Sequence, residues 1–255
     1  PFVLRRLKKD VLRELPGKEE RIVYSAASGR QQKLYTASAL KLKEALAGGA
    51  WSGNGKLEVL SQLMRLRQIC CDPALCFEDY TGESAKLETC VSLIASASAA
   101  GHKILLFSQF ASMLERIRER LLQEGISSHL LVGATPKEER SRMVQAFASD
   151  EVPVFLISLK AGGTGLNLTA ADIVIHYDPW WNVAAQNQAT DRAYRIGQEK
   201  PVTVYKLILK DTIEENLLKL QNAKLALAAQ VVSEGMVSLG DLSQNELMEL
   251  FEQNP

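Results

Sequence analysis

Short, almost purely apolar runs recur along the second half of the chain, and longer amphipathic stretches separate them. Phe110, Leu114 and Ile117 illustrate one such stretch, because they recur at the three- and four-residue intervals of a helix face. Apolar runs that alternate with helices are typical of a parallel sheet covered on both faces. The pattern predicts an α/β fold with about five mainly parallel strands joined by right-handed crossovers. The expected strands cover residues 103–107, 129–132, 154–157, 173–176 and 202–208.

The beginning and the end of the chain are expected to be mainly helical. Thr135 and Pro136 predict an N-cap followed by proline at the first helical position, and Asp211–Glu215 predicts a capping box. Further helices are expected over residues 4–15, 30–47, 57–71, 84–100, 110–121, 213–227 and 242–251. We therefore divide the chain into a linker with a helical insertion, a sheet-bearing domain and a helical tail. These three parts cover residues 1–83, 84–210 and 211–255.

Composition and charge describe an ordinary globular protein. Of 255 residues, 46% are hydrophobic and 24% are charged, which is enough to bury a core. The formal net charge is zero. This balance argues against a module that only binds DNA, although a local stripe of Lys and Arg suffices to contact phosphates. No apolar run reaches the roughly 18 residues that span a bilayer. The chain opens at Pro1 inside a charged amphipathic stretch, so we expect it to be a piece of a longer protein.

Two common kinds of site lack their sequence signatures. The cysteines form a C-C-x4-C cluster and one distant residue, without the C-x2-C pairs of a zinc site. We expect reduced, mostly buried thiols and no metal site. The phosphate-binding pattern G-x4-G-K-[ST] is also missing, and no apolar run ends in an Asp-Glu pair that could hold Mg²⁺. The chain alone is therefore not expected to hydrolyse ATP.

The segment from Gln188 to Arg195 carries two arginines three residues apart. On a helix, Arg192 and Arg195 would share one face and point at the same anionic target. A planar guanidinium can meet the charge that spreads over phosphoryl oxygens during transfer. The alternative is a solvated helix in which Asp191 and Glu199 are local ion-pair partners.

Several loops that follow predicted strands carry polar or aromatic groups. The stretch Gly162-Gly-Thr-Gly165 permits close backbone approach to a ligand, although it would also suit a plain tight connection. Two tryptophans in Asp178–Asn182 either stack on bases or lie in the core, and we favour the core for one of them. Ser108-Gln109 and Gly133–Thr135 offer groups suited to phosphate contacts that do not depend on base sequence.

Taken in order, these segments resemble the second RecA-like lobe of the Swi/Snf-type branch of superfamily-two helicases. Residues 1–20 resemble the PF-x-LRR opening segment, and residues 63–73 resemble LRQ-I-C-x-HP with Asp72 in the place of His. Residues 103–110, 154–172 and 177–198 resemble helicase motifs IV, V and VI, including the family-typical Arg-Ile-Gly-Gln. Tyr194 stands where His is commoner, and Trp180-Trp181-Asn182 surrounds the usual Trp-Asn.

The resemblance implies a fold and a set of site residues. In the family, two RecA-like lobes hold ATP between them and pump duplex DNA through a cleft. We expect a RecA-like three-layer α/β/α fold with an N-terminal helical segment and a C-terminal brace over residues 203–230. By motif matching, the catalytic residues are Arg192, Arg195 and Gln188; the ATP-facing residues are Gly163, Gly165 and Asn167; and the DNA-contacting residues are Ser108, Gln109, Thr135, Lys160 and Trp181.

The resemblance also implies partners. ATP with Mg²⁺ would bind mainly to the absent N-terminal lobe, and double-stranded DNA would be the track. A polymerase, a DNA-bound factor or a nucleosome would be the protein target. The compact lobe favours a bacterial protein of the cytoplasm or nucleoid over a nuclear one.

An inert DNA- or partner-binding module with the same fold is the alternative function. The arginine pair argues against it. A Rossmann-type enzyme is excluded because Gly162–Gly165 lacks the G-x-G-x-x-G spacing.

Overall fold

The computed structural model describes residues 15–27, 29–48, 55–162 and 165–228, together with Met248 and Phe251. Within these residues the chain forms a six-stranded sheet in the order β1-β6-β5-β2-β4-β3, and every neighbouring pair is parallel. The parallel sheet expected from the apolar runs is therefore confirmed. The strands are β1 (Lys18–Ser25), β2 (Ile104–Ser108), β3 (Ser128–Leu131), β4 (Val154–Ser158), β5 (Ile173–His176) and β6 (Val202–Leu209).

The strand β1 was not predicted from the sequence. Half of its sequence, KEERIVYS, is charged, and most of its side chains are exposed at the edge of the sheet. It pairs along its whole length with β6, from Lys18 opposite Val202 to Ser25 opposite Leu209. The sheet thus includes a strand from the segment that we assigned to the linker.

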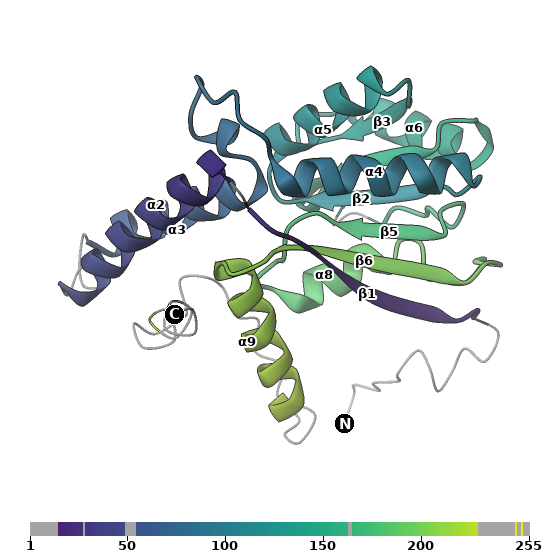
Figure 1. Cartoon of the computed structure of the whole chain (residues 1–255). Coiled ribbons are helices and arrows are strands. Elements are labelled where there is room, and N and C mark those ends of the chain that lie inside the picture. The colour runs from purple at the N-terminus through teal and green to yellow at the C-terminus, as the bar shows by residue number, and fades with distance from the viewer. Residues whose placement is uncertain are drawn as a thin grey trace.

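Helices cover both faces of the sheet in a three-layer arrangement (Figure 1). Ile104 and Leu106 of β2 pack in one apolar cluster with α4 (Ala85–Ala99) and α5 (Ala111–Gln123). Leu105 and Phe107 point to the opposite face, in a cluster with α6, α7 and α8. This two-residue alternation follows from strand geometry and gives the sheet two buried faces. The second-face helices are α6 (Lys137–Ser149), α7 (Leu159–Gly162) and α8 (Val183–Thr190).

A separate helical unit lies at the end of the sheet where the strands finish (Figure 1). It consists of α2 (Gly29–Ala47), α3 (Gly55–Cys71) and the short 3-10 helix η1 (Pro73–Leu75). The helices α2, α3 and α9 (Ile213–Ala228) share an apolar cluster that also contains Trp181 and Leu209. The expected helices near residues 30–47, 57–71 and 213–227 are confirmed.

One predicted helix start was wrong and another was confirmed. The helix α6 begins at Lys137 with Pro136 as its N-cap, and the Thr135 hydroxyl instead accepts a hydrogen bond from the Val132 amide at 3.1 Å. Proline supplies no side-chain oxygen, so this helix lacks a side-chain cap. At α9, the Thr212 hydroxyl caps the helix by accepting from the Glu214 amide at 3.3 Å, and the Glu215 carboxylate accepts from the Asp211 amide at 3.0 Å. The predicted helix start is therefore confirmed, although these are not the reciprocal bonds of a capping box.

Other expectations concern the thiols and the chain ends. All four cysteines are free; Cys70, Cys71 and Cys90 are buried, and burial raises the pKa of each of these three thiols. The expected helix over residues 4–15 lies outside the described residues, and so does the one over 242–251 apart from Met248 and Phe251, which are helical. In the described part of the chain, no helix has the length and apolar character needed to cross a membrane.

Candidate functional site

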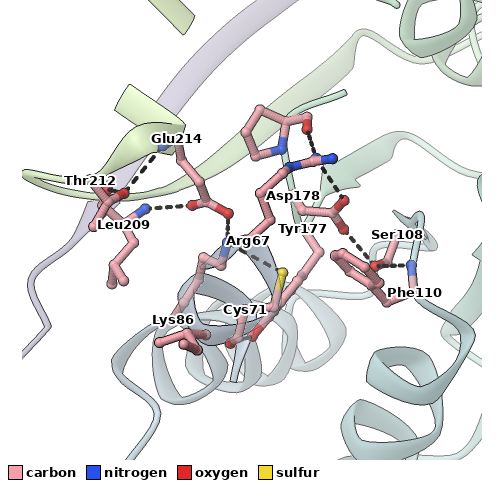
Figure 2. A network of polar contacts seen from close by, with 12 residues as sticks. Arg67, Cys71, Lys86, Ser108, Phe110, Tyr177, Asp178, Leu209, Thr212 and Glu214 are labelled. Atoms are coloured by element: carbon pink, nitrogen blue, oxygen red, sulfur yellow. Dashed lines mark hydrogen bonds and ion pairs between the residues drawn. The ribbon is translucent and has the colours of Figure 1, made fainter. Parts of the chain in front are cut away.

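A buried carboxylate organises the loops that follow β2 and β5. One oxygen of Asp178 accepts a hydrogen bond from the Ser108 hydroxyl at 2.5 Å (Figure 2). The other accepts from the Gln109 side-chain amide, also at 2.5 Å. Ser108 is 0% exposed, so its hydroxyl lies beneath the surface. Gln109 is half-buried and stands at the rim. Of this predicted DNA-contacting pair, only Gln109 reaches solvent in this conformation.

The two tryptophans after β5 differ in burial, as expected from the sequence. Trp181 is 9% exposed and packs in the apolar cluster of the helical unit, with the Arg67 guanidinium 5.6 Å from its ring centroid. Trp180 is half-buried, and its carbonyl oxygen accepts a hydrogen bond from Gln221. The expectation that one tryptophan belongs to the core is confirmed. The core residue is Trp181, to which the motif had assigned a DNA contact.

The remaining predicted DNA-contacting residues lie at the carboxyl ends of neighbouring strands. Lys160 is exposed on α7, directly after β4. Thr135 is half-buried after β3. In a parallel sheet the carboxyl ends of all strands lie along the same edge, which runs across the strands, and ligands commonly bind there. The structure therefore brings Gln109, Thr135 and Lys160 to the same edge.

The two arginines lie in turns after α8 and not on the helix. The helix ends at Thr190, so the expected shared helical face is wrong. The turn follows from short-range bonds, in which the Arg192 amide donates to Ala189 and the Arg195 amide donates to Ala193. Arg192 is 8% exposed, and Arg195 is half-buried.

The arginines nonetheless influence each other electrostatically. Burial, followed by the like charge of Arg195, lowers the pKa of Arg192, while Asp191 acts in the opposite direction. Arg192 stays charged, because arginine titrates far above neutral pH. Two cations this close in a partly buried place favour an anionic ligand.

Hydrogen bonds tie the arginine turn to the glycine-containing loop before β5. The Leu168 amide donates to the Arg192 carbonyl at 3.0 Å, and Nη1 of Arg195 lies 3.4 Å from the Leu166 carbonyl oxygen. The loop itself bends at Gly165, whose φ of +36° suits glycine. The predicted catalytic and ATP-facing segments are therefore one connected unit, although Gly163 lies outside the described residues.

The side-chain amide of Gln198 connects the arginine turn to the loop before β5. Its Nε2 atom lies 3.1, 2.8 and 3.2 Å from the carbonyl oxygens of Thr169, Ala171 and Ala193. Its Oε1 accepts from the Lys200 amide at 2.9 Å. Gln188, which the resemblance assigned to this orienting role, is exposed on α8. The sequence contained Gln198 within Arg-Ile-Gly-Gln but gave no sign that its partners would be backbone carbonyls.

A pocket of about 660 Å³ opens beside this unit, between the loop and α6. Two of the predicted ATP-facing residues, Gly165 and Asn167, line it, next to the apolar side chains of Val144 and Leu166. On the α6 side it includes Thr135, Lys137, Arg140 and Ser141. The lining offers hydrogen-bond donors and cations, which suit oxygen-rich anions.

Two of the departures from the family pattern, Asp72 and Tyr194, have local partners. Asp72 accepts a hydrogen bond from the Ala74 amide at 2.9 Å and so caps η1, and Nε of Arg116 donates to its other oxygen at 2.9 Å. The ring of Tyr194 lies 6.0 Å from the Lys18 ammonium of β1. Asp72 therefore supports the turn between the helical unit and α4.

The donor set around the arginines does not suit a metal ion. In the described part of the chain, no three His, Cys, Asp or Glu side chains gather as metal ligands. Guanidinium and amide donors bind phosphate oxygens, whereas Mg²⁺ requires oxygen ligands such as carboxylates. The groups that this chain offers therefore fit the phosphates of a nucleotide and not its magnesium ion.

Comparison with known proteins agrees with this geometry. Residues 85–197 match the family described as helicase conserved C-terminal domain, and residues 1–75 match the SNF2-related domain. An ATP-dependent helicase of Mycoplasma genitalium, named as uncharacterized, is 40% identical over 99% of this chain and 24% of its own length. The chain spans about a quarter of the length of the curated relatives it matches.

Two solved structures cover most of the chain. The Sulfolobus solfataricus SWI2/SNF2 ATPase core in complex with dsDNA matches with a TM-score of 0.76 and 34% identity, over 99% of this chain and 54% of that one. The C-terminal domain of the SWI2/SNF2 ATPase from the same organism matches with a TM-score of 0.75 and 31% identity, over 93% of this chain and 100% of that one. This chain belongs to the Swi/Snf-type family of helicase-like ATPases and is its C-terminal RecA-like lobe.

Proposed function

We propose that this chain is the second motor lobe of an ATP-driven translocase on double-stranded DNA. The observation that carries the proposal is the arginine turn, which Gln198 and the Leu168–Arg192 hydrogen bond fix against the Gly165 loop. A module that only bound DNA would have no need to hold two partly buried cations in this way. The family membership of the chain supports an ATPase role for the protein that carries it.

Arg192 and Arg195 would act on the γ-phosphate of ATP. Negative charge spreads over the phosphoryl oxygens during transfer, and guanidinium groups in a partly buried place stabilise that charge. The pre-set turn would hold both groups in position before ATP arrives, so little reorganisation would be needed at the moment of reaction.

The other lobe would supply what this lobe lacks. The phosphate-binding loop and the ligands for Mg²⁺ are expected there, because the sequence of this chain contains neither pattern. ATP hydrolysis would then require both lobes, and the chain alone would be inactive.

DNA would bind at the edge where the strands end. Gln109, Thr135 and Lys160 come from three different segments that follow strands at this edge, and they suit contacts with the phosphate backbone. The similar Sulfolobus ATPase core was solved in complex with dsDNA, which supports a DNA-binding role. Translocation would act against a protein bound to the same DNA.

The test uses the full-length protein that carries this chain. Arg192→Lys and Arg195→Lys keep the charges but remove the planar donor fork, and each should lower DNA-stimulated turnover by about 10³-fold, the size of an arginine-finger effect. DNA affinity should stay within about twofold, because phosphate contacts elsewhere supply it. Arg120→Lys is the matched control, since the Arg120 guanidinium contacts Glu88, Gln123 and Glu124 at the surface, away from the arginine turn.

The same assay separates the alternatives. Unchanged turnover in both arginine variants would favour the inert binding module. ATP hydrolysis by the 255-residue chain alone would contradict the division of work between two lobes.

A further inference from the structure

One cation of the helical unit is buried in the edge that we propose to meet DNA. Arg67 lies on α3 and is 1% exposed, which makes it one of the largest fully buried side chains. Its guanidinium points out of α3 toward Asp178 (Figure 2). The long side chain thus crosses from the helical unit into the sheet-bearing part of the chain.

The guanidinium joins two loops that are distant in sequence. Its Nη1 donates to the Gln109 side-chain oxygen at 2.9 Å, in the loop after β2. Its Nη2 donates to the Pro179 carbonyl oxygen at 2.6 Å, in the loop after β5, and lies 3.8 Å from the Asp178 carboxylate. The planar fork of arginine allows this double attachment, which a lysine ammonium could not make with the same geometry.

Gln109 receives a fixed orientation from these contacts. Its Oε1 accepts from Arg67, while its Nε2 donates to Asp178 at 2.5 Å, so both ends of the amide are engaged. One of the two Nε2 hydrogens is used in this bond, and the other remains for a further acceptor. Arg67 therefore decides where a polar group at the proposed DNA-binding edge can point.

Packing alone does not account for a charge at this place. Moving an ion from water into a protein interior is unfavourable, and an apolar side chain of similar volume is often as stabilising. A buried arginine is better explained when its directional bonds hold other groups in a defined arrangement. Here the bonds of Arg67 hold the loops after β2 and β5, which lie at the proposed DNA-binding edge.

We infer that Arg67 is a positioning residue for DNA engagement, through which the α2–α3 unit sets the relative placement of the loops after β2 and β5. The inference rests on the proposed function, because it assumes that DNA meets this edge. Arg67 itself is too deeply buried to contact DNA.

The experiment measures activation of the ATPase by duplex DNA in the full-length protein. Arg67→Gln removes the charge and the fork, and it should raise the half-activating DNA concentration about tenfold, the effect of losing one charge-assisted hydrogen bond. The KM for ATP should change by less than about twofold, since the arginine turn is left intact. Arg120→Gln is the matched surface control and should leave both constants unaltered.

A purely structural role must be told apart from a positioning role. Arg67→Lys keeps a cation opposite Asp178 and provides the test if Arg67→Gln does not fold. The double variant Arg67→Lys with Gln109→Ala should raise the half-activating DNA concentration no further than the worse of the two single variants does. Both substitutions break the same Arg67–Gln109 hydrogen bond, so their effects should not add.

Three outcomes separate the claims. Additive defects in the double variant, or a normal half-activating DNA concentration in folded Arg67→Lys, would overturn the positioning role. Absence of DNA activation in the unmodified protein would instead overturn the proposed function.

Discussion

The ion pair between Lys86 and Glu214 connects one covering helix of the sheet to the C-terminal helix. Lys86 stands near the start of α4 and Glu214 near the start of α9, and their charged atoms lie 2.5 Å apart (Figure 2). Neither side chain is more than 1% exposed. The second Glu214 oxygen accepts from the Leu209 amide at 2.9 Å, so the carboxylate also holds the end of β6.

Replacing Lys86 by Met should destabilise the chain strongly. The methionine fills a similar volume but leaves the Glu214 carboxylate buried without its counter-charge. Removing one partner of a buried pair typically costs about 3–5 kcal/mol. For a chain of this size, such a loss lowers Tm by roughly 6–20 °C.

The loss should depend on pH. Burial already raises the pKa of Glu214 above its ordinary value of 4.5, and Lys86 opposes that rise. Without Lys86 the pKa of Glu214 should rise further, so the folded variant binds a proton more tightly than the unfolded one. Its free energy of unfolding then falls as pH increases from about 4.5 through the raised pKa. The variant should be less destabilised at pH 5 than at pH 8.

Urea unfolding followed by tryptophan fluorescence at both pH values measures this effect. Lys219→Met is the matched control, because Lys219 pairs with Glu215 on the exposed side of the same α9 helix at 3.6 Å. It should change stability by less than about 1 kcal/mol. Lys86→Met combined with Glu214→Leu should recover most of the loss. The reasoning fails if Lys86→Met matches the surface control, or if its loss is the same at pH 5 and pH 8.

Three further results are expected. In the full-length protein, Lys160→Ala should weaken DNA binding and reduce the slope of log affinity against log salt concentration by about one, whereas Lys41→Ala on α2 should do neither. Titrations at several salt concentrations measure the slope, and equal slopes for the two variants would exclude the Lys160 contact. Gln198→Leu should lower kcat by up to about a hundredfold with little change in the KM for ATP, because the arginine turn loses its anchor; an unaltered kcat would contradict that role. Burial lowers the pKa of His176 to about 3, so the stability that the unmodified protein gains over His176→Leu should be lost as pH falls from 6.5 toward 3, and a pH-independent difference in unfolding free energy would refute this.

The fold was largely predictable because its central strands are buried on both faces. The strands β2, β4 and β5 are buried along their whole length and are almost purely apolar. The expected runs matched these three strands, and also β3 and β6, within a few residues. The edge strand β1 escaped notice for the opposite reason. Its side chains from Lys18 to Ile22 are all exposed, so no apolar run marks it. Its stability comes from pairing with a distant strand, which no local pattern reveals.

The site was predictable only as far as its motifs reached. Arg192 and Arg195 were placed by their match to the family, but their turn geometry depends on hydrogen bonds between backbone groups of separate segments. Backbone carbonyls carry no residue identity, so the three acceptors of Gln198 leave no mark in the sequence. Likewise, Ser108 ends β2 and Trp181 follows β5, positions where surface residues are common, yet Asp178 and the helical cluster hold them below the surface.

The pairing of β1 with β6 sets a lower limit on the length of chain that can fold in isolation. The segment matched as a helicase C-terminal domain, residues 85–197, contains neither strand. A product trimmed to those bounds would expose the flank of β5, whose apolar residues now pair with β6, and an open apolar strand edge invites association with other chains. During synthesis, β1 must likewise wait for residues 202–209 before it gains its neighbour, a late closure of the kind that slows folding. The smallest soluble unit is therefore expected to begin before Lys18 and to extend past Leu209.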